Sequence, residues 1–157
     1  MITAFANGAT GLSVFEDPYI DDPGVYLALG RAISLAVPFE DVIINGALAY
    51  SAIQILNGSA AALGSAMRHP DGRFFIAVTP AVAWTHTSSS RPAAVTVRFS
   101  FSTSDHGGNA ISLIDLTTGE KVVCGRYCEV TRSLSASAVF AAIPSTRAKS
   151  AGDETFP

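Results

Sequence analysis

The stretch from Val42 to Met67 constrains the fold more than any other part of the chain. It reads V-I-I-N-G-A-L-A-Y-S-A-I-Q-I-L-N-G-S-A-A-A-L-G-S-A-M and contains no acidic or basic residue. A helix on the surface of a soluble protein carries a charged face, and alanine, which dominates the middle of this stretch, favours helix over strand. The stretch therefore predicts a long helix that the rest of the chain encloses on nearly all sides.

The composition limits the classes of partner. The chain has 157 residues, which fits a single domain. Only 15% of the residues are charged, so we expect part of the surface to be covered by another subunit. Ten basic residues against thirteen acidic ones give no electrostatic footprint for nucleic acid, and no polybasic run suits a membrane surface.

A membrane-spanning reading of the apolar stretch is not favoured. A spanning helix needs about 20 predominantly apolar residues, whereas Asn45, Gln54 and Asn57 interrupt this run and no Lys or Arg flanks its start. The N-terminus also lacks the basic start and apolar core of a secretory signal. We therefore expect no membrane partner.

The two cysteines, Cys124 and Cys128, lie four positions apart. In one continuous strand this spacing puts both on the same face, but too far apart to bond without distortion. The C-x-x-x-C spacing matches no common zinc pattern, so no metal is expected. If the cysteines form neither a disulfide nor a metal site, they are reduced and packed thiols, which are typical of a cytoplasmic protein.

The segments around the apolar stretch read mostly as strands. Val25 to Val37 fits helix or strand by periodicity; the alternation of its last residues before Pro38 favours a strand bent at Gly30. R-H-P-D-G-R then stops the helix. Four strands are expected after it, at Phe74 to Thr87, Ala94 to Thr103, Ala110 to Leu116 and Val122 to Thr131. We divide the chain into an N-terminal arm (residues 1–24), one domain (25–143) and a flexible tail (144–157).

The order of strand, long apolar helix and four antiparallel strands resembles the hotdog fold. In that α+β fold an antiparallel sheet of about five to six strands wraps one long central helix, and two subunits pair edge to edge. The resemblance is closest to acyl-CoA thioesterases of the phenylacetate-pathway and hydroxybenzoyl type. They enter the helix with His-Gly-Gly and carry an acid nine positions after the His, where this chain has Asn45-Gly46-Ala47 and Gln54.

The resemblance implies a site at the helix entry. Unpaired backbone N–H groups at a helix N-terminus favour a developing oxyanion, and Gly46 or Ala47 would supply one; the alternative is that Asn45 only caps the helix. Asn45 and Gln54 would position the carbonyl or water. Gln54 cannot ionise, so it can hold a water or substrate but cannot take its proton; alternatively, it is a core amide bonded to a neighbouring strand or subunit.

A base for hydrolysis would have to come from elsewhere in the chain. His86, at the end of the first strand after the helix, is the best-placed histidine, although a histidine there is often only structural. Thr85 precedes it, and Tyr50 and Trp84 would line an apolar pocket. These residues complete the expected substrate site.

The resulting hypothesis is a thioesterase-like enzyme that acts on an acyl or polyketide-type thioester bound to CoA or a carrier protein. It would work as a homodimer or dimer of dimers and without a cofactor. One alternative keeps the fold but changes the reaction to a cyclisation, dehydration or isomerisation, in which orientation supplies much of the effect. Another is a non-catalytic acyl-binding subunit.

Overall fold

The computed structural model describes residues 2–11, 23–57, 62–81, 93–102, 109–134 and 137–145, and these form an α+β structure with antiparallel sheets. The helical elements are α1 (Ile2–Ala6), α2 (Pro23–Ala36), the 3-10 turn η1 (Val37–Phe39), α3 (Glu40–Asn45) and the 3-10 turn η2 (Tyr50–Ala52). The strands are β1 (Ala47–Leu48), β2 (Ile53–Asn57), β3 (Ala62–Arg68), β4 (Phe74–Pro80), β5 (Ala93–Ser100), β6 (Ile111–Asp115), β7 (Lys121–Cys124), β8 (Tyr127–Leu134) and β9 (Ala138–Pro144).

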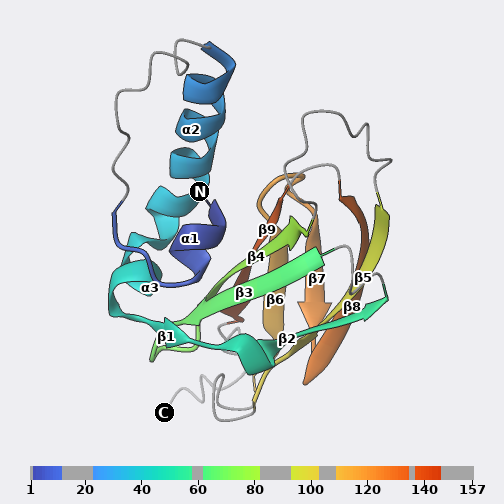
Figure 1. Cartoon of the computed structure of the whole chain (residues 1–157). Helices are drawn as coiled ribbons and strands as arrows, with labels where there is room; N and C mark the ends of the chain where they lie inside the picture. The colour runs from blue at the N-terminus through green and yellow to red at the C-terminus, as the bar shows by residue number, and fades with distance from the viewer. Residues whose placement is uncertain are drawn as a thin grey trace, which may run out of the picture.

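The strands form two sheets that pack face to face. A six-stranded sheet has the order β1-β3-β4-β9-β6-β7, and a three-stranded sheet has the order β2-β5-β8. Helices α1 and α3 and the turn η1 pack on the outer face of the larger sheet, to one side of the strands in Figure 1. The fold therefore has three layers, with the six-stranded sheet in the middle.

Strand β4 is buried on both faces, which explains its apolar sequence. Phe74 and Ile76 face the three-stranded sheet, where they share a core with residues of β5 and β8. Phe75 and Ala77 face the helices, where they pack with Phe39 and Val42. A strand covered on both sides reads as a continuous hydrophobic run instead of an alternating one.

The predicted helix from Val42 to Met67 is wrong. Among its described residues, the first four are α-helical, as the end of α3, and the residues after them form β1, the 3-10 turn η2, β2 and β3. Gly46 ends α3 in an extended conformation (φ −83°, ψ 174°), and β3 then pairs along its whole length with β4. Strand β3 lies between two apolar layers, with Ala66 in one core and Met67 in the other, whereas β1 and most of β2 are exposed.

The strand predicted for Val25 to Val37 is also wrong, because these residues form α2 and the start of η1. Pro23 is the first residue of the helix, a position where its missing N–H is not needed. Leu35 and Ala36 pack into the helical layer, and Ala32 lies one turn before Ala36 on the same side. The apparent alternation near Pro38 is part of this helical period.

The sequence predictions after Phe74 are largely correct. Strand β5 has Val95, Val97 and Phe99 buried on one face, as its alternation predicts, and Gly119 provides the positive φ of 78° in the turn from β6 to β7. The strand predicted from Val122 to Thr131 is two strands in different sheets, and β9 was not predicted. Helix α1 lies within the predicted N-terminal arm and packs on the six-stranded sheet.

Candidate functional site

A pocket of about 750 Å³ opens between the two sheets at one end of the strands. One wall comes from β1, η2 and β3, and the other from the end of β5 and the turn between β7 and β8. The volume is in the range of small-molecule sites. The lining residues are Ala47, Leu48, Ala49, Ser51, Ala52, Arg68, Phe74, Ser100, Phe101, Ser102, Arg126 and Tyr127.

The polar groups of the pocket are cationic and hydroxylic. Arg68 and Arg126 come from opposite walls, and no carboxylate is among the described residues that line it. The rings of Phe74 and Phe101 pack edge to face at 5.4 Å and are almost fully buried beneath the polar groups. Guanidinium groups bind carboxylate and phosphate oxygens through paired hydrogen bonds, so the polar lining of this pocket suits an anion.

Backbone pairing fixes the wall that carries Arg126 and Tyr127. The amide of Phe101 donates to the carbonyl oxygen of Arg126 over 2.9 Å. Tyr127 is paired in register with Ser100, and its ring lies 5.6 Å from the guanidinium carbon of Arg98. These contacts place Arg126 beside the end of β5.

The opposite wall is a tight connection from α3 to β2. Ala47 pairs with Arg68 in the register of β1 and β3. The amide of Ala49 donates to the carbonyl of Ala66 over 2.9 Å, and the amide of Ala52 donates back to Ala49 over 3.0 Å. These hydrogen bonds hold the connection close beside β3, where small side chains such as those of Ala49 and Ala52 fit.

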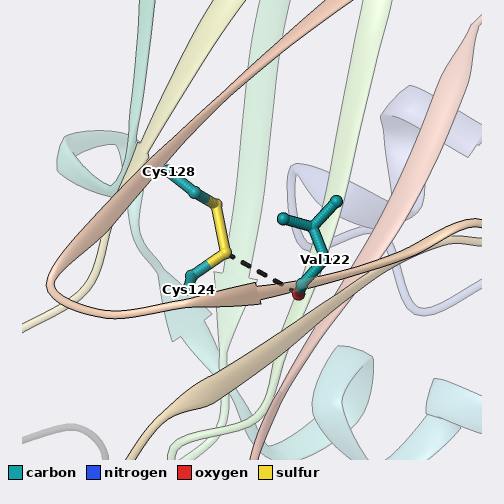
Figure 2. The surroundings of a disulfide bond; sticks show 3 residues. All are labelled: Val122, Cys124 and Cys128. Carbon is teal, nitrogen blue, oxygen red and sulfur yellow. Dashed lines mark hydrogen bonds between the residues drawn. A yellow bond between two sulfur atoms is a disulfide. The ribbon is translucent and has the colours of Figure 1, made fainter.

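A disulfide joins Cys124 at the end of β7 to Cys128 in β8, with the two Cα atoms 5.3 Å apart (Figure 2). The prediction of reduced thiols is therefore wrong. It assumed one straight strand, but the chain turns at Gly125 and Arg126, so the cysteines face each other across the turn. Cys124 Sγ also lies 3.9 Å from the carbonyl oxygen of Val122.

The structure changes the setting of the predicted oxyanion site. Asn45 and Gly46 lie at the C-terminal end of α3, not at a helix N-terminus. The amide of Gly46 donates to the carbonyl of Val42 over 3.0 Å, and the Asn45 amide group donates to Asp41 over 2.7 Å. Both groups therefore have structural partners.

The other predicted site residues are scattered. Gln54 is exposed and lies opposite Arg98 in the register of β2 and β5, so it is not a core amide. The hydroxyl of Tyr50 donates to Asn7 over 3.1 Å. Among the predicted site residues that the structure describes, Ala47 lines the pocket. Trp84, Thr85 and His86 lie outside the described residues.

The chain joins its helical layer to the β3–β4 turn through a cluster centred on His69. The imidazole Nδ1 lies 2.8 Å from Asp71 and Nε2 lies 3.4 Å from Asp41. Arg73 contacts the same two carboxylates, each over 2.7 Å. Because both ring nitrogens face carboxylates, His69 holds α3 to the turn.

This cluster makes the stability of the fold depend on pH. Hydrogen bonds from Asn45 and Arg73 lower the pKa of Asp41. Burial raises the pKa of Asp71, but hydrogen bonds from the Arg73 backbone and His69 outweigh it and the net shift is downward. A carboxylate with a lowered folded pKa stabilises the fold above its unfolded pKa, and this contribution disappears as the pH falls through the folded pKa.

We expect the urea midpoint to hold from pH 7 to pH 5 and to fall below about pH 4, where unfolded aspartates begin to bind protons. Asp71→Asn is expected to lower the midpoint at pH 7 and to reduce its fall in acid, because one of the titrating groups is gone. Equal midpoints at pH 5 and pH 3 for the unmodified chain would contradict this interpretation.

The sequence matches no family model and no curated protein. Within the part of the chain that the structure describes, no group of three or more His, Cys, Asp or Glu side chains is arranged to hold a metal ion. None of the helices described is long and apolar enough to cross a membrane.

Sequence reasoning missed the residues that define the pocket, namely Arg68, Arg126 and Tyr127. Arg68 follows the stretch that was read as a helix, and its place beside Arg126 depends on the pairing of distant strands. One local signal existed: Arg126 and Tyr127 stand between the two cysteines in C-G-R-Y-C.

Proposed function

We propose that the protein is a binding protein for a small anionic ligand that carries a carboxylate or phosphate group on a compact apolar body. The observation that carries this proposal is the place of Arg126 at the edge of a pocket of about 750 Å³ that Arg68 also lines. Two guanidinium groups on opposite walls would hold the charged group of the ligand between them.

The apolar part of the ligand is inferred from the rest of the lining. Ala47, Ala49 and Ala52 leave room along one wall, and Leu48 keeps half of its surface exposed at 50%. Phe74 and Phe101 lie beneath. Pockets of this kind use apolar walls for affinity and a few polar groups for orientation.

The Arg126 guanidinium is expected to carry much of the affinity for an anion. A hydrogen bond to a charged group contributes about 1.5–3 kcal/mol, so Arg126→Ala is expected to weaken binding by about tenfold or more. Isothermal titration of the parent and the variant with phosphate, a short-chain carboxylate and an acyl-CoA would measure this loss of affinity. It would also show which of the three anions the pocket binds most tightly.

The matched control is Arg31→Ala, which removes an exposed arginine on α2, away from the pocket lining. The Arg31→Ala variant is expected to bind the anion as tightly as the parent. Arg126→Lys keeps the charge but loses the paired hydrogen bonds, so its affinity is expected to lie between those of the parent and Arg126→Ala. Equal losses in Arg31→Ala and Arg126→Ala would mean that only net charge matters. No binding of any of the three anions would reject the proposed function.

Thioester chemistry and the hotdog relationship remain proposals. The six-stranded antiparallel sheet with helices on one face is compatible with that relationship. In the part of the chain that the structure describes, however, the stretch expected to form the central helix is mostly strand, and a second sheet covers the other face. Release of free thiol from a panel of acyl-CoA thioesters tests hydrolysis directly; no release would leave acyl binding, the non-catalytic alternative, as the better candidate.

The predicted homodimer or dimer of dimers also remains a proposal, which the mass of the protein in solution would test. The cytoplasmic location expected from reduced thiols loses its basis, because Cys124 and Cys128 form a disulfide. Disulfides persist mainly in oxidising compartments, and we infer that the protein works in one.

A further inference from the structure

The disulfide joins the two sheets and not two strands of one sheet. Strand β7, which ends at Cys124, pairs with β6 in the six-stranded sheet, and β8, which contains Cys128, pairs with β5 in the three-stranded sheet. The chain crosses from one sheet to the other in two residues, Gly125 and Arg126. The bond therefore fixes the spacing of the sheets where the chain crosses.

The same crossing forms part of the candidate pocket. Arg126 and Tyr127 lie inside the loop that the disulfide closes, and both line the pocket. Arg68 and Phe74 contribute from the six-stranded sheet. The distance between the two arginines therefore depends on how the sheets are held together.

The structure assigns to the Cys124–Cys128 disulfide the positioning of Arg126 for anion binding, which makes the affinity of the pocket dependent on redox state. This inference rests on the proposed function. In the reduced protein the turn that carries Arg126 is held by its backbone and by the hydrogen bond that the Phe101 amide donates to the Arg126 carbonyl. The turn loses the covalent loop that the disulfide closes around Gly125, Arg126 and Tyr127, so this hydrogen bond opens more often and the position of Arg126 relative to Arg68 is less fixed.

The reductant is a dithiol of the dithiothreitol type. Its two thiols lose two electrons and two protons and close to a disulfide, while the Cys124–Cys128 bond accepts two electrons and two protons and gives two thiols. Cys124 is almost fully buried, but Cys128 is only partly buried, so Cys128 Sγ is the atom that the reductant attacks.

The experiment is a comparison of anion affinity in two redox states and two backgrounds. Isothermal titration with phosphate and with a short-chain carboxylate is carried out on the oxidised and the reduced chain, with circular dichroism to verify that both are folded. The same pair of measurements is made on Arg126→Ala. The double variant Cys124→Ala/Cys128→Ala provides a reduced-like form that needs no reductant.

We expect reduction to weaken anion binding by about tenfold, the loss of one charge-assisted contact, and to change the affinity of Arg126→Ala by less than about twofold. In a double-mutant cycle, this result would show that reduction weakens anion binding through the Arg126 side chain. Binding by the oxidised chain that does not change on reduction would overturn the inference while leaving the proposed function intact. The same loss in both backgrounds would show that the disulfide acts on the whole fold and not through Arg126.

A second readout needs no ligand. The Phe101 amide, which donates to Arg126, is expected to exchange with solvent deuterium about tenfold faster or more after reduction, because local opening controls exchange. The Asp115 amide, which donates to Glu120 over 2.8 Å in the β6–β7 turn, is the internal control and is expected to keep its rate. If Phe101 keeps its rate as well, the disulfide does not position the turn, and the inference fails whether or not any anion binds.

Discussion

Asp115→Ala is expected to lower the free energy of unfolding by about 3 kcal/mol, the upper end of what a hydrogen bond to a charged group contributes. Asp115 is 2% exposed at the end of β6, and its carboxylate accepts a hydrogen bond from Arg132 of β8 over 2.9 Å. It also accepts from the backbone amides of Thr117 and Thr118. The variant loses a contact between the two sheets and the support of the β6–β7 turn together.

The control for this variant is Glu120→Ala, which removes the second carboxylate bound to Arg132. The Glu120 side chain is 57% exposed, and exposed ion pairs contribute about 0 to 1 kcal/mol. Urea denaturation of both variants at pH 7 makes the comparison. Similar losses in the two variants would mean that Asp115 is no more important than a surface carboxylate.

Burial raises the pKa of Asp115, but hydrogen bonds from Thr117 and Arg132 outweigh it, and the pKa lies below its usual range. The carboxylate thus contributes stability above the unfolded pKa, and this contribution is lost as the pH falls through the folded value. Asp115→Ala is therefore expected to show its full deficit at pH 7 and a smaller one in acid.

Gly46→Ala is expected to lower the free energy of unfolding by about 3 kcal/mol or more, at or above the upper end of overpacking changes. A Cβ atom at this position would lie 2.2 Å from the carbonyl oxygen of Val42 and 2.9 Å from that of Arg68. Both obstacles are backbone atoms, so neither can rotate away. The chain must instead separate α3 from β3, which carries one wall of the pocket.

Gly125→Ala provides the matched control, because a Cβ atom there meets nothing within 4 Å. Gly125 is not among the described glycines with positive φ, so alanine fits its backbone. We expect no loss, or a gain of up to about 1 kcal/mol from a less flexible unfolded chain. Thermal unfolding of the two variants tests this, and a Gly46→Ala protein as stable as the parent would show that α3 and β3 are not fixed at this distance.

The apolar stretch from Val42 to Met67 shows how far the sequence predicts this fold. Its lack of charge predicts burial throughout, but the structure buries mainly the start of the stretch and β3 and leaves most of β1 and β2 exposed. A buried helix and a strand covered on both faces also give the same apolar pattern. Gly46 and Gly64 were the distinguishing residues. A Cβ at Gly46 would collide with two backbone carbonyls, and one at Gly64 would lie 2.8 Å from Ile53 of the other sheet.

Local patterns were most reliable where one face is buried and the other is exposed. Val95, Val97 and Phe99 predict β5 by simple alternation, and the structure confirms it. The cysteines were misread because a spacing of four has different meanings in a straight strand and across a turn. The dipeptide Gly125-Arg126 was the local sign of that turn.

Local sequence patterns could not predict the candidate pocket. Arg68 and Arg126 are separated by most of the sheet-forming chain, and they share a pocket only because β3 and β5 belong to facing sheets. The residues expected from family resemblance depended on a helix entry at Asn45, where the structure instead has a helix end.

The most direct test of anion binding between the sheets is to map the amide chemical shifts of the oxidised protein during a titration with phosphate and with a short-chain carboxylate. We expect a saturable shift of the amides of residues 47–52, 100–102 and 126–127. Its midpoint is expected at about tenfold higher anion concentration in Arg126→Ala and at the same concentration in Arg31→Ala. Shifts confined to other surfaces, or no saturable shift with either anion, would contradict the central claim.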